Sequence, residues 1–298
     1  MNHKAITFTV VFQANSLNYG EGIANISELK KIHRGNGDVL TFASRQSLRY
    51  DVVRLGNEWF QWNLDTVDKT KGTLQFREDV SIADSVEMDL FGYLKTGKKS
   101  QKRPAVARLS HAISLEPYRS DMEFLNNMGF AERIEETPNL ANIEQHESFY
   151  SYTMTIDLSK VGVDGDVELT PQERAERVYQ LLDIVKLLNR NIRGRQESLA
   201  PLFIIGGAYP VANPFFLGRV KFQPQSKAWN INTASLHEAC ETTFAGERIG
   251  DRTYVGYVSG VFHNDSEFRD VWGEHAGSVE SFFAAMKRDV AEFYGVSE

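Results

Sequence analysis

A capped helix followed closely by an apolar strand is the segment that most constrains the fold of this chain. Thr170 and Glu173 fit a capping box around Pro171, a residue favoured at the first helical position. Gly194 ends the pattern. The sequence therefore predicts an amphipathic helix over 171–193, whose apolar stripe must be buried against another layer. That stripe recurs at helical spacing at Ala175, Val178, Leu181, Leu182, Val185 and Leu188.

Segments rich in β-branched and aromatic residues supply the other layer. Residues 201–209 predict a buried strand with a glycine break, and residues 4–13 and 148–158 alternate as strands do. A last amphipathic helix is predicted over 279–294. Strands and helices follow one another with long insertions and no Pro/Gly/Ser linker. This order predicts a single α+β domain over residues 1–298.

Composition is that of an ordinary globular chain. Hydrophobic residues make up 42% of the 298 residues and charged residues 24%. Cys240 is the one cysteine, which excludes an internal disulfide and a multi-cysteine zinc site and suits a reducing compartment. The first residues lack the apolar stretch of a signal peptide, and no run approaches the ~18 apolar residues of a membrane helix. We therefore expect a cytoplasmic protein with no membrane partner.

Charge is distributed unevenly along the chain. The formal net charge of −7 argues against a nucleic-acid partner. However, residues 30–54 hold six basic side chains against two acidic ones, and residues 91–119 hold seven against Glu116 alone. Residues 121–149 reverse this, with seven acids against Arg133. Such a chain can bind a polyanion on one face, or meet another copy of itself through opposite charges.

The segment 41–54 holds the residues best suited to bind phosphate. If it is helical, Arg45 and Arg49 share one face with Gln46 beside them. Each guanidinium can donate parallel hydrogen bonds to two phosphate oxygens. A surface helix with solvated arginines fits the same pattern. The loop before it can bring backbone N–H groups close to a ligand through its glycines and asparagines, at Asn18, Tyr19, Gly20, Gly22 and Asn25.

Residues 95–104 are basic and show no apolar periodicity, which predicts a loop without regular structure. The loop lies in a basic region of about 91–119 and carries Lys98, Lys99, Lys102 and Arg103, with Arg108 following. Four tyrosines near the basic segments have the ring that base stacking requires, although half-buried packing is the commoner role of such residues. They are Tyr19, Tyr50, Tyr93 and Tyr118.

Motifs for catalysis are incomplete. Residues 92–100 nearly match a phosphate-binding loop, but Lys99 stands where the magnesium-binding hydroxyl belongs. The histidines form no His-Glu-x-x-His motif, and the adjacent Ser110 and His111 point to opposite faces if they lie in a strand. The sequence therefore favours binding over catalysis and indicates neither a metal nor a cofactor.

Four linked motifs resemble one known family. They are GEGIANISELKK at 20–31, SRQSLRYD at 44–51, DLFGY at 89–93, and RP followed by SHAISLEPY within 103–118. On these residues the chain resembles the DevR/Cas-seven family, the repeated backbone subunit of the type I CRISPR Cascade, and within it the I-B group. The resemblance is densest over residues 6–120.

The resemblance implies an RRM-like, ferredoxin-like core with long loop insertions and a protruding thumb hairpin. It implies a non-catalytic protein of antiviral defense whose copies oligomerise along the CRISPR guide RNA (crRNA). The guide then pairs with target DNA, and other Cascade subunits complete the complex. We place the thumb at 208–234, with 95–104 as the competing choice. The RNA contacts are then Asn18, Tyr19, Gly20, Gly22, Asn25, Ser44, Arg45, Gln46, Arg49, Lys98, Lys99, Lys102, Arg103 and Arg108.

Two other functions stay open. Related backbone subunits of type III complexes are RNA endonucleases that use a thumb aspartate, but residues 208–234 contain no aspartate. A transcriptional regulator is the third possibility, although no helix-turn-helix signature supports it. The net acidity leaves undecided how much RNA the chain holds when alone.

Overall fold

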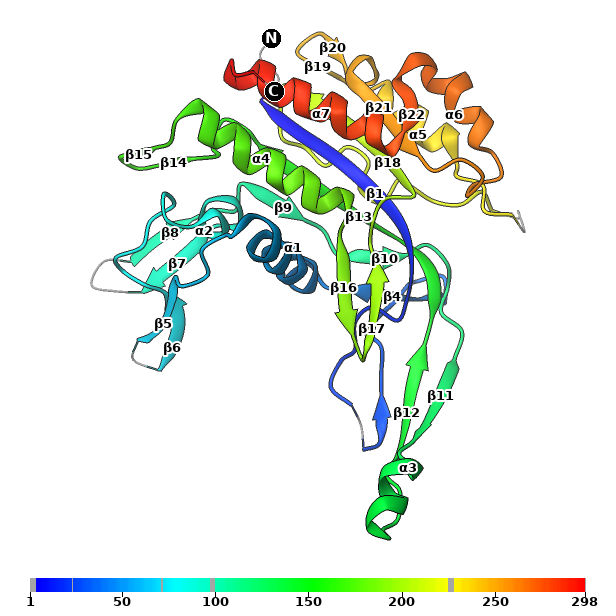
Figure 1. Ribbon diagram of the computed structural model, residues 1–298. Coiled ribbons are helices and arrows are strands. Elements are labelled where there is room, and N and C mark those ends of the chain that lie inside the picture. The colour runs from blue at the N-terminus through cyan, green and yellow to red at the C-terminus, as the bar shows by residue number, and fades with distance from the viewer. Residues whose placement is uncertain (1–3, 23, 71, 97–99, 225–227, 298) are drawn as a thin grey trace.

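A central sheet organises the molecule (Figure 1). The computed structural model describes residues 4–22, 24–70, 72–96, 100–224 and 228–297, and within these ranges the sheet has nine strands. Across the sheet they are β22 (Ala276–Ser278), β21 (Thr253–Tyr257), β18 (Phe203–Tyr209), β1 (Ala5–Asn15), β13 (Glu147–Asp157), β10 (Ala112–Ser114), β4 (Val39–Ala43) and β3 (Lys31–His33), with β9 (Ala107–Leu109) also paired to β13.

The four middle strands have ferredoxin-like connectivity. The chain runs from β1 through α1 (Arg45–Phe60) to β10 and β13, then through α4 (Pro171–Lys186) to β18. In space the order is β18-β1-β13-β10, and each neighbouring pair is antiparallel. This is the β-α-β-β-α-β arrangement with both helices as crossovers. The α+β fold expected from the sequence is confirmed.

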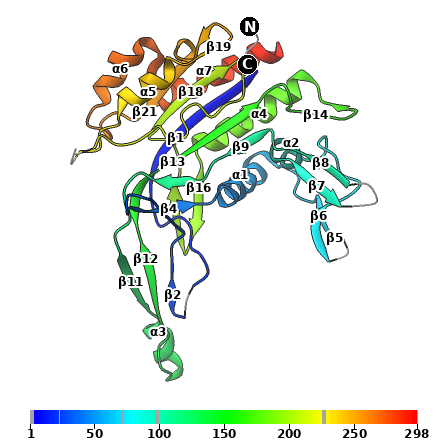
Figure 2. The same cartoon turned by 180° about the vertical axis from the view of Figure 1, so that it is seen from behind.

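Alternation along β1 divides the core into two layers. Phe8 and Val10 face α1, α4 and α7 (Val279–Tyr294), in a large apolar cluster. Val11 points to the other face, where it packs with Phe203 below α5 (Thr233–Cys240) and α6 (Asp265–Trp272). Both views place α5 and α6 over the β18–β21 end of the sheet (Figures 1 and 2). The predicted helix over 279–294 is confirmed as α7.

The predicted helix over 171–193 is confirmed in its start but was wrong in its end. Thr170 and Glu173 form the capping box, but α4 stops at Lys186 and a hairpin of β16 (Asn189–Ile192) and β17 (Arg195–Ser198) follows. Arg190 explains the change, because it leaves the helix to pair with the buried carboxylate of Asp51 at 3.0 Å. A buried ion pair overrides the helical preference of the last turn.

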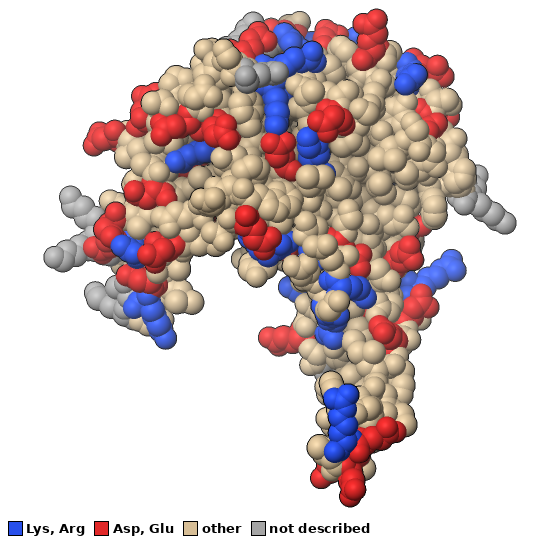
Figure 3. Space-filling view, in the orientation of Figure 1, with Lys and Arg blue, Asp and Glu red and all other residues tan. Residues whose placement is uncertain are grey.

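Two projections extend from the same side of the body (Figure 1). The first, which we call the arm, spans residues 121–145. It contains β11 (Asp121–Asn126), α3 (Met128–Ala131), η1 (Glu132–Ile134) and β12 (Leu140–Gln145), with β2 (Ile26–Ser27) paired to β12. The second contains β5 (Val67–Thr70), β6 (Thr73–Phe76), α2 (Val86–Phe91), β7 (Tyr93–Thr96) and β8 (Ser100–Arg103). The surface between the two projections is hollowed (Figure 3).

The second projection corrects the expectation of an irregular loop over 95–104. Residues on both sides of 97–99, which lie outside the described residues, pair as the hairpin of β7 and β8. Lys95 and Arg103 are both buried within it. Its basic composition hid a strand alternation in which two of the inward side chains are cations.

The segment 208–234 runs from the last residues of β18 to the first residues of α5 and packs largely on the body. Phe216, Val220 and Ile231 are buried in the second core layer. Phe222 and Ile231 form an isolated antiparallel bridge, and the turn at 225–227 lies outside the described residues. The longest projecting ribbon among the described residues is therefore the arm.

Short elements complete the fold. They are β14 (Val163–Asp164), β15 (Val167–Glu168), β19 (Thr243–Phe244), β20 (Glu247–Arg248), η2 (Ile249–Arg252) and η3 (Gly273–His275). Among the described residues, no helix has the length and apolar character needed to cross a membrane.

Candidate nucleic-acid interface

The start of α1 is a meeting point of three chain segments. Ser44 is its N-cap, and its hydroxyl accepts a hydrogen bond from the Ser47 N–H at 3.2 Å. The Arg45 N–H donates to Nδ1 of His111 at 3.0 Å. The side-chain oxygen of Asn18 accepts from the Ser44 N–H at 3.2 Å, which joins the glycine-rich loop to the helix. These bonds fix the direction in which Arg45 leaves the body.

A cleft opens beside this helix start, and we call it the arginine cleft. It has a volume of about 450 Å³. Four of the residues predicted to bind RNA line it, and they come from segments about 60 positions apart in the sequence. The remaining wall is apolar. The lining residues are Arg45, Gln46, Arg49, Phe91, Ala105, Ala107, Arg108 and Leu109.

The three cleft arginines differ in how free they are. Arg45 and Arg108 are exposed, and the Nε of Arg108 donates to the Ala105 carbonyl at 3.1 Å. Arg49 is 35% exposed and is bound to Glu87 at 2.5 Å, with its guanidinium 5.4 Å from the centre of the Phe91 ring. An anion in the cleft must therefore share Arg49 with the Glu87 carboxylate or displace it.

The glycine-rich loop lies next to the arm rather than in the cleft. The Tyr19 hydroxyl donates to the Glu144 carbonyl at 3.1 Å, and the Gly20 N–H donates to the Glu28 carbonyl at 2.8 Å. A side chain at Gly22 would meet the Ile26 carbonyl at 2.7 Å. Asn25 is exposed, and its carbonyl accepts from an arm N–H. Part of the loop's backbone is therefore already engaged in hydrogen bonds within the protein. Among its predicted residues, Asn18 is the one with a hydrogen bond to the start of α1.

The structure places Arg103, a residue predicted to bind RNA, inside the body rather than on its surface. Its side chain is 6% exposed and pairs with the fully buried Asp89 at 2.7 Å. Arg177 of α4 binds the other oxygen of Asp89 at 2.8 Å. We call these three residues the Asp89 cluster. Arg103 joins β8 to α2 through Asp89, which also binds Arg177 of α4. Its guanidinium is buried and is not accessible to an external phosphate.

The lysines of the basic region differ in their surroundings. Lys98 and Lys99 lie outside the described residues. Lys102 is exposed and lines a separate pocket on the second projection. Lys95 lines that pocket too but is buried, and burial lowers the pKa of its ammonium group. The concentration of cations in the sequence therefore overstates the positive surface.

Arg193 is a candidate that the sequence did not single out. It lies in the turn of the β16–β17 hairpin with φ of 48°, is exposed, and holds its guanidinium 4.2 Å from the centre of the Tyr19 ring. Sequence analysis placed it in the last turn of a helix. The following Gly194 fits a hairpin turn as well as a helix end, and that was the available signal.

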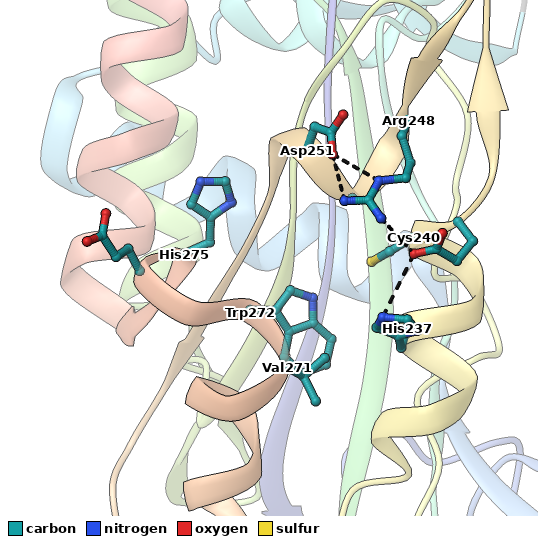
Figure 4. A pocket seen from close by; sticks show the side chains of 10 residues that line it. His237, Cys240, Arg248, Asp251, Val271, Trp272 and His275 are labelled. Atoms are coloured by element: carbon teal, nitrogen blue, oxygen red, sulfur yellow. Dashed lines mark hydrogen bonds and ion pairs between the residues drawn. The ribbon is translucent and has the colours of Figure 1, made fainter.

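A second pocket lies between α5 and α6 (Figure 4). Its charges largely satisfy one another, since Arg248 pairs with Asp251 at 2.8 Å and with Glu241 at 3.0 Å. Burial raises the pKa of the Cys240 thiol, which keeps it in the less reactive protonated form. Among the described residues, no group of three or more His, Cys, Asp or Glu side chains is placed to hold a metal ion.

Comparison with known families identifies the family to which the chain belongs. Residues 6–222 match the model of the family described as CRISPR-associated negative auto-regulator DevR/Csa2. The chain belongs to the DevR family. No curated protein matches its sequence. The DevR fold is shared with solved structures of distant sequence. One, "CRISPR RNA-guided surveillance complex, pre-nicking", has a TM-score of 0.60 and 11% identity, with 96% of this chain and 100% of that chain covered.

A second solved structure agrees with the first. It is "CRISPR RNA-guided surveillance complex", with a TM-score of 0.55, 12% identity, and 97% of this chain and 99% of that chain covered. At such low identity the two structures show the fold of this DevR member. That fold extends over almost the entire chain in both comparisons.

Proposed function

We propose that this DevR-family chain is a non-catalytic, RNA-binding backbone subunit of a CRISPR surveillance complex in the cytoplasm. Copies line up along the guide RNA, hold it by its phosphates and leave it able to pair with target DNA. Two findings support this: the family is CRISPR-associated, and two solved structures with the same fold are RNA-guided surveillance complexes.

The arginine cleft is the observation that carries the proposal. A guide varies in sequence while the protein does not, so the protein must hold the guide by its backbone. Arg45, Arg49 and Arg108 present guanidinium groups in one cleft, and this geometry suits phosphate. Asn18 and Ser44 fix the start of the helix that carries two of them. Lys102 and Arg193 are further exposed cations outside the cleft.

We propose that the arm makes the contact with the neighbouring copy. All six residues of β11 are exposed, and β11 is an edge strand, the kind of surface that associates unless it is covered. We place the thumb here rather than at 208–234, because Phe216 and Ile231 of that segment are already buried in the body. The exposed apolar residues of the arm are Met122, Phe124, Leu125, Met128, Phe130, Ile134 and Leu140.

Such an arm gives an open assembly. It belongs to one end of the molecule, so its docking on another part of the next copy is heterologous, and repeated heterologous contacts build a filament or helix when the ring does not close. Guide RNA then sets the length of the assembly.

Co-expression tests the proposal. The chain is purified alone and together with a CRISPR array and its sister subunits, and any nucleic acid that co-purifies is sized on a denaturing gel. We expect a discrete RNA of guide size in a large particle from the second sample. The double variant Phe124→Ser/Phe130→Ser should remain folded but lose the large particle. A nucleic-acid-free monomer in both wild-type samples contradicts the proposal.

A second function has a specific observation in its favour. The family description names a negative auto-regulator, and sequence-specific binding of duplex DNA is the direct way for such a protein to act. A mobility-shift assay on the promoter of its own operon, with a scrambled duplex as control, distinguishes this role from guide binding.

The arm also reopens the endonuclease alternative. Asp121 is exposed at the base of the arm, so the lack of aspartate in 208–234 no longer decides the matter. Metal-dependent cutting of a complementary RNA at regular intervals, lost in Asp121→Asn, would favour that alternative. We expect no cutting by either protein.

A further inference from the structure

We propose that Tyr50 stacks on a base of the RNA strand whose phosphates lie in the arginine cleft. The inference rests on the proposed function and extends it from the sugar–phosphate backbone to the bases. It starts from an aromatic side chain on α1 whose ring is left in solvent. Tyr50 is 67% exposed, although it is in the middle of a well-ordered helix.

The other three tyrosines near the basic segments have internal partners. The Tyr19 ring lies against Arg193, and the Tyr93 hydroxyl donates to Asp164 at 2.9 Å. The Tyr118 ring packs with Lys31 and His146 at centroid distances of 5.0 and 5.4 Å.

Tyr50 differs from all three. Within the described ranges of the chain, the structure gives its side chain neither a hydrogen bond nor a ring contact. Packing within the chain therefore explains Tyr19, Tyr93 and Tyr118 but leaves Tyr50 unexplained. A single exposed aromatic is unremarkable in itself, so its position relative to the cleft carries the argument.

That position is beside the cleft. Gln46 lines the cleft and lies four residues before Tyr50, so the two side chains are neighbours along one helix face, with Cβ atoms about 5–6 Å apart. Arg49 directly precedes Tyr50 and turns toward Phe91 on the cleft side. A strand whose phosphates sit on Arg45 and Arg49 has its bases displaced to one side of them. The exposed ring of Tyr50, one helical turn beyond Gln46, offers a surface on which such a base can stack.

Stacking fits the demands of a variable guide. Every base has a π-face, so a ring can support a base without reading its identity. A hydrogen-bonding side chain at this point would select among bases instead. Tyr50 lies on a helix anchored by the buried Leu48 and Val52, so its ring is presented from a rigid element.

The test uses the full chain and a 30-nucleotide single-stranded RNA that carries 2-aminopurine at successive positions. We expect Tyr50→Ala to weaken binding by roughly 5- to 100-fold and to relieve the quenching of 2-aminopurine at one position. The slope of log affinity against log salt should not change, because stacking releases no counterions. Tyr50→Phe should keep both affinity and quenching, since it retains the ring.

Two controls keep the outcomes distinct. Phe244→Ala removes another exposed aromatic, on β19 far from α1 in the fold, and should change nothing. Arg45→Ala/Arg49→Ala should weaken binding and lower the salt slope. If the arginine variant weakens binding while Tyr50→Ala matches the wild type, the stacking role is wrong and the phosphate role stands. If neither variant has an effect, or the wild-type chain does not bind, both the stacking role and the RNA site fail.

Discussion

Arg103 and Arg108 lie five residues apart in one basic stretch, yet the molecule uses them in opposite ways. Arg103 is buried against Asp89 at 2.7 Å, whereas Arg108 is exposed on the rim of the arginine cleft. The difference comes from the partner. Arg103 pairs with the buried carboxylate of Asp89 on α2. Arg108 has no carboxylate partner among the described residues. Counting cations in a sequence therefore locates a basic region without saying which cations remain available to a ligand.

The largest effect should come from breaking the Asp89 cluster. Arg177→Ala leaves the fully buried Asp89 short of one of its two cations, and the removal of one partner of a buried pair typically costs about 3–5 kcal/mol. Urea unfolding of the variant measures this loss. Arg108→Ala is the matched control and should change the free energy of unfolding by less than about 0.5 kcal/mol. Equal effects of the two substitutions would remove the distinction between the two regions.

The buried pair of Asp51 and Arg190 should make the stability of the protein depend on pH. Asp51 is 2% exposed, and burial raises its pKa to about 6 despite the nearby Arg190 and Arg54. The native state then holds a proton that the unfolded chain has released, so this group's contribution to stability falls as pH rises from about 4 to 6. Relative to wild type, Asp51→Asn should gain up to about 3 kcal/mol across that window. A constant difference between the two proteins over the same pH range would contradict this.

His111 holds the start of the helix that carries Arg45 and Arg49, and its loss should have an intermediate effect. Its Nδ1 accepts the Arg45 N–H at the first turn of α1, and loss of an acceptor at a helix start costs about 1 kcal/mol. His111→Ala should therefore lower the free energy of unfolding by about that amount. His111→Asn, which retains an acceptor, should lose less. The measurement is thermal unfolding of both variants, and an unchanged stability of His111→Ala would show that this bond contributes nothing.

Periodicity and capping predict the parts of the core that depend on neighbours in sequence. The capping box at Thr170, the apolar stripe of α4 and the helix over 279–294 depend on neighbours in sequence, which a linear reading captures. The end of α4 depends on Asp51, more than a hundred residues away, and so was missed. The arm was missed as well, since β11 is exposed along its whole length, β12 is only partly buried, and both carry little of the apolar alternation that marks a strand.

The candidate site shows the same contrast between features set by sequence neighbours and features set by distant residues. Arg45, Gln46 and Arg49 were predicted to share a face and do so, because helix geometry alone relates them. Arg108 joins them only through the pairing of β9 with β13, which spacing cannot show. Arg103 was predicted to be exposed and is buried, because its pairing with Asp89 cannot be predicted from the sequence. Long-range carboxylates, rather than local pattern, decided which predicted residues remain exposed.

The central claim is that the cleft arginines bind phosphate, and the salt dependence of RNA binding tests it most directly. Affinity for a fixed single-stranded RNA is measured over a range of salt for the wild type and for Arg45→Ala/Arg49→Ala. The account predicts weaker binding for every RNA sequence and a log–log slope that falls by roughly 1.4–1.8, the equivalent of two phosphate contacts. An unchanged slope would contradict it, because arginines that released no counterions would not have been touching phosphate.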